Sequence, residues 1–529
     1  MAQINTKALL MYNLDPMIHL DFNKRKLTLT QRALLTLVGN MLVQIAEFLT
    51  GFFVTPFIIR GLGQELYGAW GMLQQLLGYF SLTEFRATGS LRFLLGLQQH
   101  YNNNDEKQRL VGSTLIVWGM SLPVTIAFSI GLLWFLPDII HVSSSSITGI
   151  RVALIILIVN ALLDRVLAIP MHILKAQNMD YAGMGINTTM VIMASLLSGI
   201  AIWLGWGLPG LAAATMANVL LISIGRFWVA RRIIPWMAIK KPNRDEFTHF
   251  LNTSGLFFLA GLASLLLYST DTLLVGAIIG PSVAASYTTS GAVLRMIGEP
   301  LFQFVGAGNA GLVGLCGEKD WERVANVRKE MYFILFFFMA ILGSGVIALN
   351  GAFLKLWLGA EFYGGSLLTI FLVLSLTATF LARIDFTISN AMLYLREQTW
   401  ALLTAGSVGL GSGLFFLRIF GVGGMAIGMA IGNLVLLTIA WILIQRQMPA
   451  ASTTLIKSLF RPSFTIISLF GLAFFLQPYI EVPNWGVFFL YGLGIGGFSF
   501  IASWFLVLSK EIRKVLFIRA QHNIPFLNK

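Results

Sequence analysis

This chain of 529 residues has little charge, one cysteine and no spacing of side chains typical of a metal or nucleotide site. Charged residues make up 11% of it, against about 25% in soluble globular proteins. The single Cys316 excludes an internal disulfide. No CxxC or HxxxH spacing indicates a metal site, and no GxxxxGK[ST] run offers a nucleotide-binding loop. We therefore expect no metal and no cofactor.

Hydrophobic residues, in contrast, account for 57% of the chain, which is typical of a protein that crosses a membrane many times. Runs long enough to span a bilayer recur throughout. They predict an all-α integral membrane protein of about 14 transmembrane helices. We expect these spans in 34–59, 66–85, 111–136, 152–174, 181–204, 208–228, 255–279, 283–315, 332–349, 367–395, 400–417, 425–444, 464–480 and 487–508.

The basic residues predict an orientation. The net charge of +13 could indicate nucleic acid, but in a multi-spanning protein an excess of Lys and Arg marks cytoplasmic loops. With the N-terminus inside, the cytoplasmic segments and the adjoining span ends hold 29 of the 36 Lys and Arg residues. The other side holds four, and three lie within spans. A miscounted span would spoil this alternation, so we expect both termini in the cytoplasm and no nucleic-acid partner.

An internal repeat predicts two lobes. GLPGLAAATMANVLL (207–221) resembles GVGGMAIGMAIGNLVLL (421–437), and LGQELYGAW (62–70) resembles IGPSVAASY (279–287), at an offset near 215 residues. The small residues let helices approach closely. Two six-helix lobes around a central cavity, with an extra helix pair, are a transporter plan. The predicted parts are a cytoplasmic N-terminal segment (1–30), an N-lobe (31–232) and a cytoplasmic linker (233–249). A C-lobe (250–446) follows, and then spans 13–14 with a tail (447–529).

Polar residues form stripes along several predicted spans. Ionisable residues inside spans are candidates for function because burying charge in an apolar setting is costly. Arg295 lies about 12 residues into span 8, or about 18 Å along a helix, and shares a face with Glu299. Pro300 should bend that helix. The other stripes include these residues: Asn40, Gln44 and Glu47; Ser264, Tyr268 and Asp271; Ser375, Thr379, Arg383 and Thr387; Asn160 and Asp164, with Arg165 beside them.

The charge types indicate a cargo. Guanidinium forks match phosphate oxygens, so the three arginines within spans (Arg165, Arg295 and Arg383) predict a phosphate or pyrophosphate group in the cavity. The acids in or near the cavity are expected to carry a proton or a cation, or to hold an arginine: Glu47, Asp271, Glu299 and Asp385. The alternative is that these charges pair and hold helices together. In that case Arg295 would meet Glu299, and Arg383 would meet Asp385 or a neighbouring helix.

The chain resembles the Wzx-type polysaccharide flippases of the MOP superfamily, which also contains the MATE exporters and the lipid II flippase MurJ. The stretches that carry the resemblance are PFIIRGLGQELYGAW (56–70), DTLLVGAIIGPSVAASY (271–287), FLKLWLGAEFYGGS (353–366) and the two G-x-x-G turns. The resemblance covers spans 1–12. In the MurJ branch an arginine and a glutamate on span 8 and an acid on span 1 matter, and Arg295, Glu299 and Glu47 occupy similar places. The arginine-rich first helix of MurJ proteins is absent from span 1.

The resemblance implies a flippase that moves a polyprenyl-pyrophosphate-linked oligosaccharide to the outer leaflet of a bacterial inner membrane by alternating access. Membrane lipids and this substrate would be its partners, together with polymerase or glycosyltransferase machinery. Two alternatives remain: a MATE-like cation-coupled exporter and a non-transporting scaffold for polysaccharide assembly. A MATE exporter is expected to have twelve spans and no cavity arginines. The loops are too short for a soluble catalytic domain, so we expect no enzyme.

Overall fold

The computed structural model describes residues 29–83, 85–98, 101, 103–143, 146–306, 309–392, 394–446, 448–510 and 512–514. All but the last two residues of the predicted segment 1–30 lie outside this part of the chain. The side chain of Gln303, which continues the predicted stripe of Arg295 and Glu299, also lies outside it. Every regular element in the described part is a helix. Helices satisfy their own backbone hydrogen bonds, which an apolar chain in a bilayer requires. The prediction of an all-α multi-pass membrane protein is confirmed.

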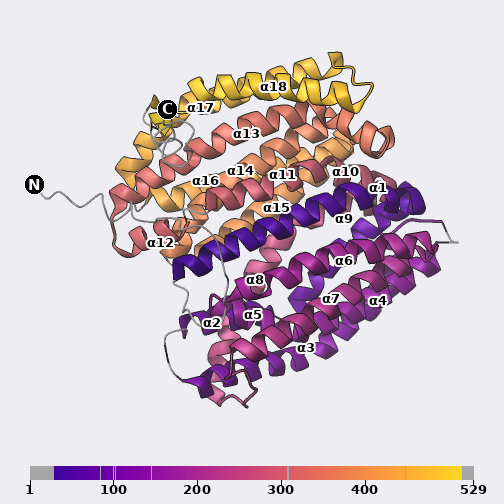
Figure 1. Cartoon of the computed structure of the whole chain (residues 1–529), viewed down its shortest axis with the longest axis vertical. Coiled ribbons are helices and arrows are strands. Elements are labelled where there is room, and N and C mark those ends of the chain that lie inside the picture. The colour runs from indigo at the N-terminus through magenta and orange to yellow at the C-terminus, as the bar shows by residue number, and fades with distance from the viewer. Residues whose placement is uncertain are drawn as a thin grey trace, which may run out of the picture.

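The helices form two bundles that lie side by side, with α1 along the border between them (Figure 1). Helix α1 packs against α6 on one side and α10 on the other. The first bundle, shown in purple and magenta, comprises α2–α7. Helix α1 and the helices of this bundle span these residues: α1 Leu29–Thr83, α2 Ala87–Leu97, α3 Asn104–Ile139, α4 Ile147–Leu167, α5 Ile169–Ala176, α6 Met184–Trp203 and α7 Gly207–Ile233.

The second bundle comprises α10–α18, and α8 and α9 lead into it from the linker 234–243. Its centre is α13, whose apolar stretch is largely buried and against which α14, α17 and α18 pack. Helix α8 lies against both α2 and α15. The bounds are α8 Arg244–Tyr268, α9 Thr270–Ile278, α10 Pro281–Ser290, α11 Ala292–Gly306, α12 Asn309–Gly317, α13 Trp321–Trp357, α14 Ser366–Ala391, α15 Leu395–Phe420, α16 Val422–Gln445, α17 Pro449–Leu476 and α18 Trp485–Leu506.

By length and composition, twelve helices of the described part could cross a membrane. The first of these, Leu34–Thr83, has 50 residues and bends at Gly63, so it contains both of the first two predicted spans. The predicted span 283–315 is not among the twelve because it falls on the shorter helices α10, α11 and α12. The number of fourteen spans therefore stays a prediction.

The glycines at the turns matched by the sequence repeat all have positive φ. Gly63 and Gly280 both have positive φ, at 78° and 135°, and so do Gly207 and Gly421, at 56° and 57°. These conformations suit glycine, which has no Cβ. Gly63 interrupts α1, and Gly280 separates α9 from α10. The equivalent turns support the predicted repeat.

Small residues bring α15 and α16 into backbone contact, as the second G-x-x-G segment predicts. A Cβ atom on Gly428 would lie 2.1 Å from the backbone nitrogen of Gly413, and one on Gly432 would lie 2.6 Å from the carbonyl oxygen of Ala405. Side chains larger than hydrogen do not fit between these helices. Helices α15 and α16 are therefore closely packed within the second bundle.

Candidate functional site

A charged pair joins α11 to α14 within the second bundle. Arg383 donates from Nη1 to Glu299 Oε1 at 3.1 Å and to Oε2 at 3.3 Å. The Arg383 side chain is 34% exposed and that of Glu299 is 46% exposed. Tyr268 at the end of α8 is also exposed and lies within hydrogen-bonding reach of Arg383. Three helices thus bring accessible polar groups to one place.

Arg295 lies one turn before Glu299 on α11 but does not pair with it. Its Nη2 donates to the carbonyl oxygen of Thr288 at 2.6 Å, beside the junction of α10 and α11. The side chain is exposed, and no carboxylate of the described residues lies within 4.0 Å of its guanidinium. Asp271 and the hydroxyls of Tyr287 and Tyr67 are its electrostatic neighbours. Arg295 therefore has hydrogen-bond donors left for a ligand.

Asp271 contacts the next helix along the chain. Tyr287 donates from its hydroxyl to Asp271 Oδ2 at 2.6 Å, across the turn at Gly280, and the Thr272 N–H donates to Oδ1 at 2.8 Å. The predicted stripe through Tyr268 and Asp271 is interrupted, because α8 ends at Tyr268 and α9 begins at Thr270. The sequence spacing assumed one continuous helix there.

Glu47 is exposed on α1. One turn further on, Gly51 faces α11, since a Cβ there would lie 3.3 Å from Met296 Cε. Helix α1 runs toward the Gly63 turn and α11 runs away from it, so the two helices are antiparallel. Glu47 on α1 therefore lies level with residues 299–300 of α11 along the helix axes. Helix α1 borders both bundles.

Asp385 has a different setting from the other candidate acids. Its two carboxylate oxygens accept from Arg328 Nε and Nη2, each at 2.7 Å, and Oδ2 also accepts from the Tyr332 hydroxyl at 3.0 Å. The Asp385 side chain is fully buried and that of Arg328 is 2% exposed. This ion pair ties α14 to α13. Arg328 lies before the predicted span 332–349, in a segment expected to be a cytoplasmic loop, whereas α13 begins at Trp321 and so includes this residue.

The predicted stripe on α14 divides between two neighbours. Ser375 and Thr379 are hydrogen-bonded to the Asn433 side chain of α16, at 2.8 and 2.9 Å, while Arg383 reaches α11. The first half of the stripe thus holds two helices together. Arg165 lies near the end of α4 in the first bundle, with His172 among its neighbours, and so belongs to a different group from Arg295.

The two bundles are joined at the end of the molecule that carries the Gly63 turn, which we call the Gly63 end. Gln64 of α1 donates to the carbonyl oxygens of Glu361 and Ser282 at 2.9 and 3.2 Å, and to Ser286 Oγ at 3.0 Å. Gly68 lies so close to α10 that a Cβ there would be 1.7 Å from the Pro281 carbonyl oxygen. This end is closed around α1 and α10.

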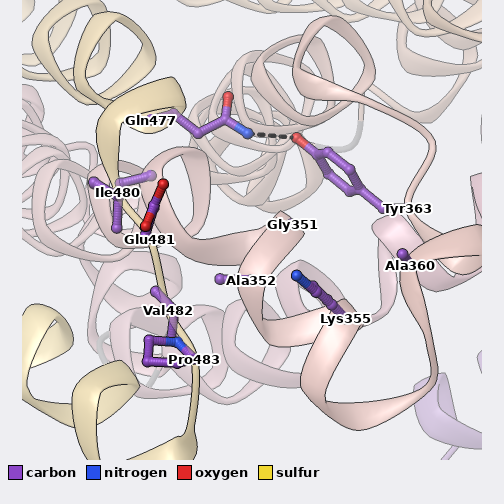
Figure 2. A pocket seen from close by; sticks show the side chains of 11 residues that line it. Gly351, Ala352, Lys355, Ala360, Tyr363, Gln477, Ile480, Glu481, Val482 and Pro483 are labelled. Carbon is purple, nitrogen blue, oxygen red and sulfur yellow. Dashed lines mark hydrogen bonds between the residues drawn. The ribbon is translucent and has the colours of Figure 1, made fainter.

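A pocket of about 550 Å³ lies at the same end, between the end of α13 and the α17–α18 turn. In Figure 2 Lys355 and Glu481 lie on opposite walls, with Gly351 and Ala352 between them. Gln477 donates to the Tyr363 hydroxyl at 2.9 Å at one edge. The pocket is separate from the Arg295 and Glu299 groups, which α11 carries.

The sequence matches a family of known proteins. The sequence profile of the family described as "Polysaccharide biosynthesis protein" matches residues 31–307, more than half of the chain. The protein belongs to this family. It is also 21% identical over 352 residues to the "Uncharacterized membrane protein EpsK" of Bacillus subtilis (strain 168). This match covers 61% of this chain. The matched part spans 65% of that relative, just under two thirds of its length.

Solved structures share the fold. The "Lipid II flippase MurJ, inward closed conformation" superposes with a TM-score of 0.64 at 14% identity, covering 92% of this chain and 99% of that one. An inward-facing "multidrug resistance MATE family transporter of the MOP superfamily" gives a TM-score of 0.58 at 15% identity, covering 77% and 96%. A MOP superfamily transporter from Pyrococcus furiosus gives a TM-score of 0.57 at 14% identity, and the match covers 80% of this chain and 96% of that one. At these identities the likeness establishes the fold alone.

Proposed function

We propose that the protein is a flippase that moves a polyprenyl-pyrophosphate-linked oligosaccharide from the cytoplasmic to the outer leaflet of a bacterial inner membrane. The observation that carries this proposal is the group of accessible polar side chains within apolar helices, Arg295 together with Glu299 and Arg383. An exposed guanidinium facing lipid tails would be costly, so we infer that these groups face water between the bundles. Membership of the polysaccharide biosynthesis family supports a carbohydrate cargo.

In this mechanism Arg295 binds the pyrophosphate, because its guanidinium has donors to spare and lies at the junction of α10 and α11. Glu299 holds Arg383 while no substrate is bound and releases it when phosphate oxygens compete for the guanidinium. Glu47 and Asp271 are the proposed coupling acids. We assign the Gly63 end to the outer face, so the closed joint at Gln64 corresponds to the state that receives substrate from the cytoplasm.

A flipping assay in proteoliposomes tests the proposal. The substrate is a fluorescent polyprenyl-pyrophosphate oligosaccharide, and its leaflet is read from quencher access. Arg295→Gln should reduce flipping at least about tenfold, since charge-assisted hydrogen bonds to phosphate contribute about 1.5–3 kcal/mol. Arg418→Gln is the matched control, because this residue lies in the last turn of α15 at the Gly63 end, outside the Arg295 group. Unchanged flipping by a folded Arg295→Gln protein would contradict the assignment.

The same vesicles separate the alternatives. A cationic dye is added in a parallel experiment, as a MATE-type substrate. Transport of the dye without movement of the lipid-linked sugar would favour a cation-coupled exporter, for which accessible Glu299 and Glu47 would be the cation ligands. A scaffold would move neither compound, and the polar side chains of α11 would then be dispensable for polysaccharide production in cells.

A further inference from the structure

Two charges of opposite sign lie on opposite walls of the pocket at the Gly63 end. Lys355 belongs to the last turn of α13, and Glu481 belongs to the turn between α17 and α18 (Figure 2). Both residues are exposed. Neither forms an ion pair within 4.0 Å with any residue that the structure describes. A ligand with a single charge would match one wall and leave the other unmatched, whereas a zwitterion matches both.

The wall that carries Tyr363 is held in place by its contacts. The Tyr363 hydroxyl accepts from Gln477 Nε2 at 2.9 Å, which joins two walls at one edge of the pocket (Figure 2). The Gly364 N–H donates to Ser290 Oγ at 2.9 Å. A Cβ on Gly351 would lie 3.1 Å from the Tyr363 ring, so the ring lies against α13. The pocket is therefore formed without a ligand, which lowers the entropic cost of binding.

Tryptophan side chains place this pocket at the level of lipid headgroups. Trp357 is the last residue of α13 and Trp485 is the first residue of α18. Phe52 stacks on Trp357 with ring centroids 5.7 Å apart and meets Trp485 at 6.2 Å. Tryptophan is enriched where a membrane meets water. Lys355 and Glu481 each lie within four residues of one of these tryptophans, so both charges lie near that boundary.

An apolar pocket of about 310 Å³ adjoins the first pocket. It lies between α13, α17 and α18, and Ala348 and Ile480 line both pockets. On α13, Ser344 and Ala348 of the apolar pocket precede Gly351 and Lys355 by seven residues each, or about 10 Å along the helix. The apolar pocket therefore lies deeper in the membrane than the two charges. A charged headgroup with an acyl chain below it has the same order as these two pockets.

We propose that the two pockets bind one phospholipid with a phosphoethanolamine headgroup, its phosphate at Lys355 and its ammonium at Glu481. Lysine binds phosphate as a point charge, and a carboxylate accepts hydrogen bonds from an ammonium group. An acyl chain in the apolar pocket leaves water, which is favourable. This inference goes beyond the proposed function, because the lipid is a bound component and not the cargo. It ties the α17–α18 pair to α13.

Binding of radiolabelled dihexanoyl phosphatidylethanolamine to the purified full chain in a maltoside detergent tests the site. Dihexanoyl phosphatidylglycerol has the same chains and phosphate but no ammonium, so the parent should bind it about tenfold less tightly. Glu481→Gln should abolish this preference, whereas Lys355→Gln should weaken binding of both lipids about tenfold. The matched controls are Arg418→Gln and Asp138→Asn, in the last turns of α15 and α3 and outside both pockets, and they should bind like the parent.

Competition identifies the source of the headgroup. Phosphoethanolamine without chains should compete at least about tenfold less well than the short-chain lipid, because it leaves the apolar pocket empty. Equal competition would overturn the role of the apolar pocket in favour of a soluble zwitterion. Equal binding of both lipids by the parent would overturn the site, and so would unchanged affinities in Lys355→Gln and Glu481→Gln proteins that size-exclusion chromatography shows to be folded. A parent that binds as expected but flips no lipid-linked sugar would refute only the proposed function.

Discussion

The buried ion pair between Arg328 and Asp385 gives the sharpest energetic prediction. Two hydrogen bonds of 2.7 Å join the side chains, both are almost fully buried, and the guanidinium lies 4.2 Å from the Trp441 ring centroid. Removing one member of such a pair costs about 3–5 kcal/mol, because the other charge stays buried without its partner. Stabilities are typically about 5–15 kcal/mol, so Asp385→Leu should strongly destabilise the protein.

Thermal denaturation in detergent, followed by size-exclusion chromatography, measures the effect. The double variant Arg328→Met with Asp385→Leu should recover most of the loss, because apolar side chains of similar volume replace a buried pair at little cost. The control is Arg323→Met, which removes an exposed pair with Asp320, where about 0–1 kcal/mol is at stake. It should denature like the parent.

The double variant also separates a structural role for Asp385 from a coupling role. If the carboxylate only ties α13 to α14, the stabilised double variant should still flip substrate. A double variant that folds as well as the parent but no longer transports would refute this reasoning and return Asp385 to the coupling acids. Equal stability of the parent and Asp385→Leu would refute the energetic argument itself.

Three further predictions concern helix contacts and the accessible pair. Gly428→Val should separate α15 from α16 and cost at least about 1–3 kcal/mol in thermal stability, whereas Gly411→Val, with open space around it, should not. Gly68→Val should open the Gly63 end, so a cysteine placed at Ser282 in a cysteine-free background should react faster with a maleimide; an unchanged rate would contradict the closed joint. Glu299→Gln should change the free energy of unfolding by no more than about 1 kcal/mol, since its ion pair is accessible, yet reduce flipping in the proteoliposome assay.

The apolar runs predicted most of the helices because their length and composition alone determine a spanning helix. What they could not predict were interruptions. The break at Ser269 separates Tyr268 from Asp271 although no Gly or Pro marks it, and the predicted span 283–315 divides into α10, α11 and α12. The turn at Gly280 was predicted, because glycine and proline mark turns there. Local sequence thus fixes turns better than breaks within apolar runs.

The partners of the polar residues were harder to predict than their positions. The spacing of Arg295 and Glu299 on one helix face pointed to an intrahelical pair, but Glu299 meets Arg383 of α14 instead. Such contacts depend on how helices pack, which the periodicity of one helix does not contain. Arg328 escaped notice for a related reason: its neighbours along the chain are polar, and only packing against α14 and α16 buries it.

The strength of the joints differs between the interior of a bundle and the border between bundles. Within the second bundle, backbone contact at Gly428 and the buried Arg328–Asp385 pair resist separation. Near the Gly63 end, the three hydrogen bonds of Gln64 and the one from Trp357 Nε1 to the Phe52 carbonyl oxygen join α1 to the second bundle, and at about 1 kcal/mol each they amount to about 4 kcal/mol. Conformations separated by a few kcal/mol exchange readily, and a ligand with modest differential affinity shifts them. Alternating access requires this arrangement: bundles that move as units, joined at one end by contacts weak enough for substrate binding to break.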